Sequence, residues 1–388
     1  MFNLAQKLAD LGIMGINRRN AEYTLALNPR RYYPLVDDKL RTKELALAAG
    51  IPVPDLYGVV KTEYEVRHLP VWLRDHEDFV VKPAHGSGGE GILVIAGRAR
   101  ANFRTVGGEL LTLEELNHHV FNILGGLYSL GGQTDAAMIE YRVRFDPVFD
   151  HICFQGVPDV RIIVFLGVPV MAMLRLPTRQ SGGKANLHQG AIGAGIDLAT
   201  GTTLQGVSHQ GIVGEHPDTG HGISGLAVPR WDTLLAIAAR TYELTQLGYL
   251  GVDMVLDQDK GPLLLELNAR PGLAIQIANA AGLLHRVRLV EAHSGALTTV
   301  EARIAFAREH FGALVGNTSS TRGSSENLKG DLASQLDCPY FLRPRAWASR
   351  WTNSRSCAAR PAKVSKGVTS QVNRLHMGRL RNIRSNSP

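Results

Sequence analysis

The chain has 388 residues, of which 44% are hydrophobic and 20% charged, and its formal net charge is +7. This length and composition are ordinary for a soluble globular protein with two or three packed domains. No apolar run is long enough to cross a bilayer, and the first residues lack the apolar segment of a signal peptide. We therefore expect a cytoplasmic protein without a membrane span.

The positive charge is concentrated at the C-terminal end. From Leu314 onward the sequence holds 13 Lys and Arg against 3 Asp and Glu, which is a charge of +10. Subtracting that from the total of +7 leaves about −3 for the rest, so the basic balance does not identify a partner of the folded body. The Ser-, Asn- and Arg-rich tail from 313 to 388 is predicted to be disordered. It is either a nucleic-acid or membrane-surface arm or, as we favour, a functionless extension.

Three cysteines at unrelated spacings, Cys153, Cys338 and Cys357, indicate neither a disulfide framework nor a zinc site. The body mixes helices and strands without strict alternation, so we expect an α+β (mixed α/β) fold. Asp37 and Asp38 favour the start of a helix that Gly50 ends. A long Gly-rich polar loop, 177–195, is of the kind usually retained for function. The remaining predicted elements are strands at 56–60, 79–83, 92–97, 137–143, 159–167 and 168–176, and helices at 112–124, 231–248 and about 273–292.

The stretch FVVKPAHGSGGEGILVI, 79–95, is the first candidate for chemistry. The lysine precedes the glycines, and a β-branched run follows them, so the pattern is neither a Walker A loop nor a dinucleotide-binding turn. It predicts a strand–turn–strand hairpin whose glycine N–H groups could face a phosphate chain, with Lys82 beside the turn. By itself the loop also fits a mobile surface hairpin with a solvated lysine.

The stretch 248–272 predicts a second antiparallel hairpin, with a four-residue turn from Gln258 to Gly261. In that register Asp253 lies opposite Glu266, and Asn268 follows on the same face. The other face would pair Val252, Met254 and Leu256 with Leu267, Leu265 and Leu263. Two carboxylates about 5 Å apart repel by about 3 kcal/mol at an effective dielectric constant near 20. A divalent cation on hard oxygen ligands would remove that repulsion, so we favour a magnesium site over a hairpin with screened acids.

Together these features resemble the ATP-grasp superfamily. Its glycine-loop pattern is matched by Lys82, Pro83, Gly86, Ser87, Gly89 and Gly91, and its metal hairpin by Asp253, Glu266, Asn268, Pro271 and Gly272. Within the superfamily the chain looks like the α-L-glutamate ligase-like proteins related to the ribosomal-protein glutamate ligases. That likeness rests on Asp159, Arg161, Arg175, Asn186, Leu187, His188 and Gly190. It covers about residues 10–300; the stretch from Glu140 to Asp159 is longer than usual, and the tail has no counterpart.

The resemblance implies ATP and Mg²⁺ as cofactors, with Mn²⁺ as the alternative metal. It assigns nucleotide binding to Lys39, Lys82, Gly86, Ser87, Gly88, Gly89, Gly91, Glu140, Asp159, Lys184 and Asn186, with Glu140 at the adenine hinge. It assigns the metal to Asp253, Glu266 and Asn268, and catalysis to Arg175, Lys184 and Arg270, with His188 on the closing loop. Other roles remain open: Arg175 could pair with a structural acid, Arg270 could brace the hairpin, and Lys184 could be solvated.

The function that the resemblance implies is an ATP-dependent carboxylate–amine ligase. Such an enzyme phosphorylates a carboxylate, and an amine then attacks the acyl phosphate. We expect glutamate or a similar amino acid to be joined to an unknown peptide or small acceptor. The alternative is a nucleotide-binding regulatory protein without ligase turnover. Nucleic acid is not an expected partner, because the body lacks interleaved aromatic and basic residues. Related folds often pair, so a homo-oligomer is an open expectation.

The expected architecture is an ATP-grasp fold of two α+β subdomains that clamp the nucleotide. We divide the chain into an N-terminal region at 1–36, a first subdomain with the glycine loop at 37–135, a second subdomain with the metal hairpin at 136–312, and the tail at 313–388.

Overall fold

The computed structural model describes residues 2–86, 88–129 and 132–312, with side chains from Gln6 onward. These residues belong to one compact unit. The tail for which we expect disorder, 313–388, lies outside the described residues, as do residues 1, 87 and 130–131. No helix of the described part is long and apolar enough to cross a bilayer.

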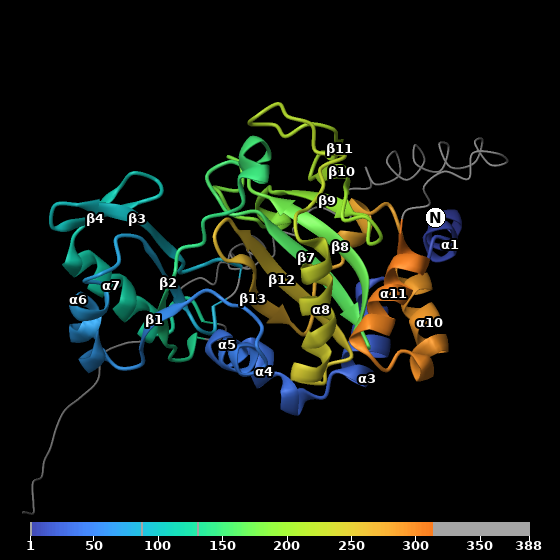
Figure 1. The fold of residues 1–388 in the computed structure, drawn as a ribbon, viewed down its shortest axis with the longest axis horizontal. Coiled ribbons are helices and arrows are strands. Elements are labelled where there is room, and N and C mark those ends of the chain that lie inside the picture. Colours follow the sequence, from blue (N-terminus) through green and yellow to red (C-terminus); the bar gives the residue numbers. More distant parts are fainter. Residues whose placement is uncertain (1, 87, 130–131, 313–388) are drawn as a thin grey trace, which may run out of the picture. The chain divides into compact units, whose positions relative to one another are not determined.

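The first sheet has six antiparallel strands in the order β1-β6-β2-β3-β4-β5. Figure 1 labels β1, β2, β3 and β4 of this sheet. Phe79 and Val81 lie on one face of β2, as the two-residue period of a strand predicts, and both are buried with Leu116 of α7. The elements are β1 (Leu56–Val60), α6 (Leu69–Trp72), β2 (Phe79–Pro83), β3 (Leu93–Ala99), β4 (Asn102–Thr105), β5 (Leu110–Leu111), α7 (Leu113–Leu124) and β6 (Ala137–Glu140).

The boundary expected at 135/136 does not coincide with the division between the sheets. Strand β6 follows that boundary in sequence, yet it pairs with both β1 and β2 of the first sheet. The chain leaves this sheet only after Glu140, at the end of β6. A strand that returns to the middle of a sheet from a distant point in the sequence has no local signal, so the sequence alone could not assign it.

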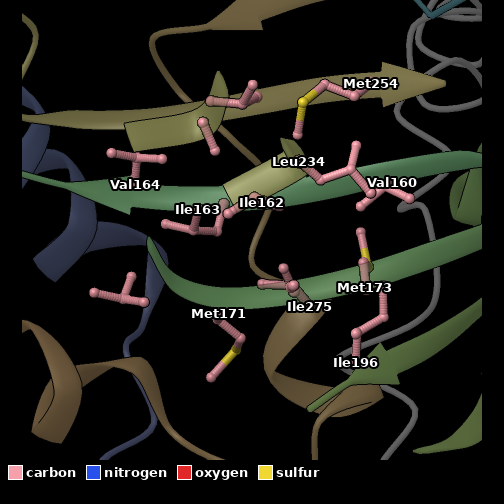
Figure 2. Close-up of a cluster of buried hydrophobic side chains, with 14 of the residues drawn as sticks. Val160, Ile162, Ile163, Val164, Met171, Met173, Ile196, Leu234, Met254 and Ile275 are labelled. Carbon is pink, nitrogen blue, oxygen red and sulfur yellow. The ribbon is translucent and has the colours of Figure 1, made fainter. Parts of the chain in front are cut away.

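The second sheet has seven antiparallel strands in the order β11-β10-β9-β8-β7-β12-β13. Helix α8 (Trp231–Thr245) packs on β7, β8 and β12 and ends at Thr245 rather than at 248. Figure 2 shows Leu234 of α8 in one apolar cluster with Ile162 and Met254. The strands are β7 (Asp159–Phe165), β8 (Val168–Leu176), β9 (Ile192–Ile196), β10 (Thr203–Ser208), β11 (Gly211–Val213), β12 (Tyr249–Asp257) and β13 (Gly261–Asn268).

Helix α5 (Lys39–Ala48) begins and ends as the sequence predicts. Asp38 Oδ1 accepts hydrogen bonds from the backbone N–H groups of the second and third helical residues, at 2.9 and 3.3 Å. Gly50 has φ +67°, a left-handed conformation that glycine adopts without strain at a helix end. These two ends fix where the helix presents Lys39 and, one turn later, Lys43.

The predicted helix at 273–292 is interrupted, giving α9 (Ile275–Ala278) and α10 (Leu283–His293). The side chain of Gln276, in α9, spans the break: its Oε1 accepts from the backbone N–H of Met14 at 2.8 Å and from the first N–H of α10 at 3.0 Å. Its Nε2 donates to the Met14 carbonyl at 3.1 Å. The N-terminal segment thus takes up hydrogen bonds that a continuous helix would make within itself.

The N-terminal region is attached to the second sheet. Asn28 Nδ2 donates to the carbonyls of Tyr249 and Ala269, at 2.7 and 2.9 Å, and its Oδ1 accepts from Tyr249 N at 2.9 Å. The Tyr23 ring packs edge-on against Phe165 on β7, with 5.6 Å between centroids. The remaining helices are α1 (Phe2–Asp10), α2 (Ile16–Arg18), α3 (Leu25–Leu27), α4 (Pro34–Asp37) and α11 (Val300–Phe311), and a π-helical segment spans Arg19–Thr24.

Candidate nucleotide and metal site

The glycine loop joins β2 to β3, the hairpin that the sequence predicts. Its backbone adopts the left-handed region at Gly88 (φ +65°), Gly89 (φ +77°) and Gly91 (φ +72°). The Gly86 carbonyl oxygen accepts a hydrogen bond from Lys39 Nζ. Ser87, which we expect to bind nucleotide, lies outside the described residues. The loop is therefore shaped by glycine-specific conformations and tied at its start to α5.

Lys43, Lys82 and Glu140 form a buried ion cluster, called the lysine cluster below. Lys82 Nζ contacts one carboxylate oxygen of Glu140, and Lys43 Nζ lies 2.9 Å from the other. Lys43 also donates to the Pro54 carbonyl. Burial alone would raise the pKa of Glu140, but the attraction of Lys82 and Lys43 lowers it overall. Two ammonium groups thus share one carboxylate beside the glycine loop.

Lys39 links the glycine loop to the acidic hairpin. Its Nζ, already bonded to the Gly86 carbonyl, lies 3.8 Å from Glu266 Oε2. Burial lowers the pKa of Lys39, while the charge of Glu266 acts to raise it. One amine at the start of α5 therefore touches both sequence motifs, which are far apart along the chain.

Strands β12 and β13 form the predicted acidic hairpin, and the predicted register is confirmed around its carboxylates. Asp253 pairs with Glu266, Gly251 with Asn268 and Val252 with Leu267. The side chains of Asp253, Glu266 and Asn268 therefore share one face.

The register predicted beyond Asp253 is wrong, because it shifts there by one residue. Met254 pairs with Leu264 instead of Leu265, and the turn closes with Asp257 opposite Gly261. The cause lies in the turn, where Asp257 Oδ1 accepts hydrogen bonds from the backbone N–H groups of Asp259 and Lys260, at 3.0 and 2.9 Å. That side-chain capping shortens the loop, and a β-bulge in β13 absorbs the extra residue.

Asp159, Arg161, Arg175 and Asp253 form a second buried ion cluster, called the arginine cluster. Arg161 binds Asp253 through both its Nε, at 2.6 Å, and its Nη2. Arg175 Nη2 lies 2.9 Å from the same carboxylate, and Arg175 binds Asp159 in two-pronged fashion, one contact being 2.6 Å. Arg175 therefore pairs with buried acids, the alternative that its sequence context left open.

Arg161 and Arg175 reduce the repulsion between the acids of the hairpin, an arrangement that the sequence does not predict. Burial alone would raise the pKa of Asp253, but Arg161 and Arg175 hold it well below its ordinary value. Burial raises the pKa of Asp159, a rise that Arg175 opposes and Asp253 reinforces. The expected repulsion across the hairpin is thus offset by cations from β7 and β8.

The predicted residues of the long loop reach different places. The side chain of Lys184 lies beside the glycine loop, its Cδ 3.7 Å from the point where a Cβ on Gly89 would stand. Asn186 Oδ1 instead accepts from the backbone N–H of His188 at 3.0 Å, within the loop. On the acidic hairpin, Asn268 Oδ1 accepts from Arg270 N at 2.9 Å.

Arg270 is exposed, and its guanidinium carbon lies 5.3 Å from the centre of the Tyr33 ring. The N-terminal region is thus beside the turn that follows the acidic hairpin, and Arg19 Nη1 donates to the Pro271 carbonyl at 2.7 Å. Both contacts hold that turn in place.

The oxygen atoms of the acidic hairpin fit a hard divalent cation. Among the described residues no group of three or more His, Cys, Asp and Glu side chains is arranged to hold a metal. The expected ligands are two carboxylates and one amide, and Asp253 and Glu266 are paired across the two strands. Glu266 is 38% exposed, and the amide oxygen of Asn268 has a second lone pair. This donor set suits Mg²⁺, provided that Asp253 gives up an arginine contact.

Two residues of the site, Lys43 and Arg161, were given no role from the sequence. Lys43 follows Lys39 by one helical turn, a spacing that places both side chains on one face of α5 and could have indicated a pair. Arg161 lies two residues after Asp159 on β7, so both side chains lie on the face of the sheet that carries the acids. Their partners, Glu140 and Asp253, come from strands distant in sequence.

Comparison with solved structures gives several ATP-grasp ligases as similar folds. The ATP-grasp ligase PsnB complexed with a minimal precursor is 16% identical at a TM-score of 0.38, over 69% of this chain and 63% of that one. The D-cycloserine synthetase DcsG is 16% identical at 0.40, over 70% and 74%. The D-alanine–D-alanine ligase of Coxiella burnetii is 17% identical at 0.40, over 72% and 59%. The aligned region thus spans less than two thirds of the PsnB chain.

No curated protein matches the sequence. The family profile described as sugar-transfer associated ATP-grasp matches residues 18–292, which is well over half of the chain and includes both hairpins and both ion clusters. The chain belongs to the sugar-transfer associated ATP-grasp family.

Proposed function

We propose that this protein is an ATP- and Mg²⁺-dependent carboxylate–amine ligase that works through an acyl phosphate. The observation that carries the proposal is the position of Lys39. Its amine bonds the glycine-loop carbonyl of Gly86 and lies 3.8 Å from Glu266 of the acidic hairpin. A nucleotide phosphate chain and its cation need this combination of a flexible N–H-rich loop, a lysine and paired carboxylates.

The proposed nucleotide site consists of the glycine loop with Lys39 and Lys82, backed by Glu140 and flanked by Asp159, Lys184 and Asn186. The proposed metal ligands are Asp253, Glu266 and Asn268. A bound magnesium ion neutralises charge on the terminal phosphates and favours phosphoryl transfer. The excess positive charge of the lysine cluster supports the same assignment, because a buried excess of positive charge favours an anionic ligand.

The proposed roles of the other side chains follow from their charge and placement. Arg175, held by two carboxylates, stabilises the transferring phosphoryl group or the tetrahedral intermediate. Lys184, beside the glycine loop, helps to exclude water from the acyl phosphate. Arg270, exposed next to the acidic hairpin, binds a substrate carboxylate in two-pronged fashion. We also propose that the two sheets, with their helices, are the subdomains that hold the nucleotide.

The substrates are proposed from two sources. The sequence pattern Asp-x-Arg with Asn-Leu-His supports a glutamate-ligase-like reaction in which glutamate or a similar amino acid is one partner. The family description, associated with sugar transfer, supports a sugar-bearing acid or amine as the other. Sugar acids and amino sugars therefore belong among the test substrates, together with amino acids and peptides.

The test is phosphate release from Mg-ATP across that panel. We expect release that depends on substrate, and its loss in Glu266→Ala, because the variant removes an acid next to Lys39. Glu77→Ala is the matched control. Glu77 is exposed on the segment between α6 and β2, and it lies outside the proposed site. Unchanged release in Glu266→Ala would reject the assigned site.

A nucleotide-binding regulatory protein without ligase turnover is the second candidate. It is favoured by the state of Asp253, whose two carboxylate oxygens both bind arginine side chains. Calorimetry and the phosphate assay together separate the two functions: both proteins bind Mg-ATP, but a regulator releases no phosphate with any acid and amine of the panel, whereas a ligase does.

A further inference from the structure

Asp135 is a buried carboxylate with an unusually complete set of donors at the root of the glycine loop. Its side chain is 0% exposed. It accepts from the backbone N–H of His85 at 3.1 Å to each oxygen, from His85 Nδ1 at 2.8 Å, from Ser129 Oγ at 2.5 Å and from Ala136 N at 2.7 Å. Burial alone would raise the pKa of Asp135, but the hydrogen bonds from Ser129 and His85 lower it overall. The group is therefore a carboxylate at neutral pH.

The hydrogen bond to Asp135 decides which nitrogen of His85 carries the proton. A carboxylate only accepts, so Nδ1 must be the donor, and in the neutral ring Nε2 is left with its lone pair. The ring is 46% exposed, and Nε2 lies 3.7 Å from Asp38 Oδ2, beyond hydrogen-bonding distance. Asp135 thus presents a basic nitrogen to the open side of the ring.

His85 lies next to the proposed site. His85 is followed directly by Gly86, whose carbonyl binds Lys39, and Lys39 lies 3.8 Å from Glu266. Burial raises the pKa of Asp37, and the charges of Arg270 and His85 oppose that rise, which places both side chains within electrostatic reach of Asp37. His85 therefore lies at the start of the glycine loop, one residue before the carbonyl that binds Lys39.

A purely structural role for the His85 ring does not account for its exposure. Both oxygens of Asp135 already bind the His85 backbone N–H, so the loop is held at this point without the side chain. A ring that served only to clasp the loop would be expected to pack its second nitrogen against a partner. The pairing of a buried carboxylate with a half-exposed imidazole is instead the arrangement that orients a general base.

We propose that His85 is the general base of the ligase reaction and that Asp135 is the residue that positions it. The inference rests on the proposed function. The acceptor amine attacks the carbonyl carbon of the acyl phosphate, so that a C–N bond forms; as the carbonyl re-forms, the C–O bond to the phosphate breaks and inorganic phosphate leaves with the bonding electrons. The proton lost by the amine nitrogen goes to His85 Nε2, and Asp135 stabilises the imidazolium. Asp38 and Asp37 are the other acids near the ring, and Arg270 and Lys39 are the cations whose charges act on Asp37.

The test compares two nucleophiles in His85→Asn. Asparagine keeps a side-chain donor for Asp135 but lacks Nε2. Hydroxylamine is unprotonated at neutral pH and traps an acyl phosphate as a hydroxamate without a base, whereas an amino-acid amine must lose a proton. We therefore expect amide formation to fall by about 10²-fold or more in the variant. Hydroxamate formation, with the carboxylate on which the wild-type protein is active, should stay near the wild-type rate.

The controls separate the failure of this inference from the failure of the proposed function. His118→Asn changes an exposed histidine of α7 and should alter neither rate. If the wild-type protein forms neither hydroxamate nor amide with any acid of the panel, the ligase function fails and the role of His85 fails with it. If it forms both and His85→Asn lowers both equally, the ligase stands and the general base is overturned.

Measuring the affinity for Mg-ATP tests whether His85→Asn acts by weakening nucleotide binding. Calorimetric affinity for Mg-ATP should be unchanged in His85→Asn, because a base for the second step does not contact the phosphates in the first. A loss of affinity similar to that of Glu266→Ala would show that His85 binds phosphate and would overturn the proposal. Asp135→Asn provides an independent check: it removes the partner that orients Nδ1 and should lower amide formation more than hydroxamate formation.

Discussion

The lysine cluster and the arginine cluster are both buried, but their charges balance differently. In the lysine cluster two ammonium groups share the single carboxylate of Glu140, which leaves one positive charge in excess. In the arginine cluster two guanidinium groups face two carboxyl groups, so the set is neutral when both acids are ionised. Glu266 stands next to Asp253 and adds one negative charge on that side.

This difference indicates the sign of the ligand at each place. An unbalanced buried charge is unfavourable in the absence of a counter-charge, so an imbalance in a folded protein is expected where a ligand supplies one. Phosphate oxygens would complete the lysine cluster, and a cation would complete the pair of Asp253 and Glu266. The imbalance, rather than the number of charges, carries the functional information.

The largest effect is expected for Glu140→Gln. The substitution leaves two buried ammonium groups without a carboxylate, so the free energy of unfolding should fall by about 3–5 kcal/mol, as for other broken buried pairs. Urea denaturation of the nucleotide-free protein measures it. Asp55→Asn is the control, because Asp55 pairs with Lys260 at 2.8 Å on the surface, where a pair contributes about 0–1 kcal/mol. Equal losses in the two variants would contradict the comparison.

The difference in unfolding free energy between the wild type and Glu140→Gln should depend on pH, with a sign set by the pKa of Glu140. The pKa of Glu140 is lowered in the folded state, so its ionised form contributes stability above the pKa of the unfolded chain, about 4.3. The difference in unfolding free energy between wild type and Glu140→Gln should therefore be constant at neutral pH. It should decrease as the pH falls below that value and through the folded-state pKa.

Asp253→Asn should destabilise the protein less, by about 1–3 kcal/mol, the range for a lost hydrogen bond to a charged group. Arg175 keeps its two-pronged contact with Asp159, and the asparagine retains one acceptor for Arg161. Urea denaturation again measures the change. Calorimetry with and without Mg²⁺ should show a weaker dependence of ATP binding on the metal. A loss of stability as large as that in Glu140→Gln would show that charge balance does not distinguish the clusters.

The parts of this molecule that the sequence predicts correctly are those defined by neighbouring residues. The Asp38 cap, the Gly50 stop, strand β2 and the pairing of Asp253 with Glu266 each follow from local side-chain chemistry or from a two-residue period. The α+β class of the fold is also predicted correctly, whereas the two antiparallel sheets are what the structure adds. These features require no knowledge of contacts between distant segments.

What the sequence did not predict depends on such distant contacts. The membership of β6 in the first sheet is decided by its pairing with β1 and β2. The arginine partners of Asp253 come from β7 and β8, and the carboxylate that binds Lys82 comes from β6. The bulge in β13 arises from a turn closed by the Asp257 side chain, which a strict alternation of faces does not include. The motifs therefore predict a candidate site, whereas tertiary pairing decides the charge balance of its residues.

The glycine loop next to the lysine cluster offers a smaller effect that depends on shape rather than charge. Gly88 and Gly91 both have positive φ, so alanine strains the backbone at either position. A Cβ on Gly91 would also come within 2.5 Å of the Tyr128 ring, whereas nothing lies within 4 Å of one on Gly88. Gly91→Ala should therefore lower the free energy of unfolding by about 1.5 kcal/mol more than Gly88→Ala. Equal values from urea denaturation would mean that Tyr128 moves aside without penalty.

The smallest effect is expected for the cap of α5, and it tests whether the lysine cluster depends on the helix that carries Lys43. Asp38→Ala removes the side-chain acceptor at the helix start and should lower the free energy of unfolding by about 1 kcal/mol, whereas Asp38→Asn retains a good cap and should be nearly neutral. If the cap holds Lys43 in place for Glu140, the effect of Asp38→Ala should differ in the Glu140→Gln background, and the two changes will not add. In the Asp253→Asn background they should add, because the arginine cluster shares no partner with α5 residue Lys43. Additivity in both backgrounds would show that the two lysines reach Glu140 independently of the helix start.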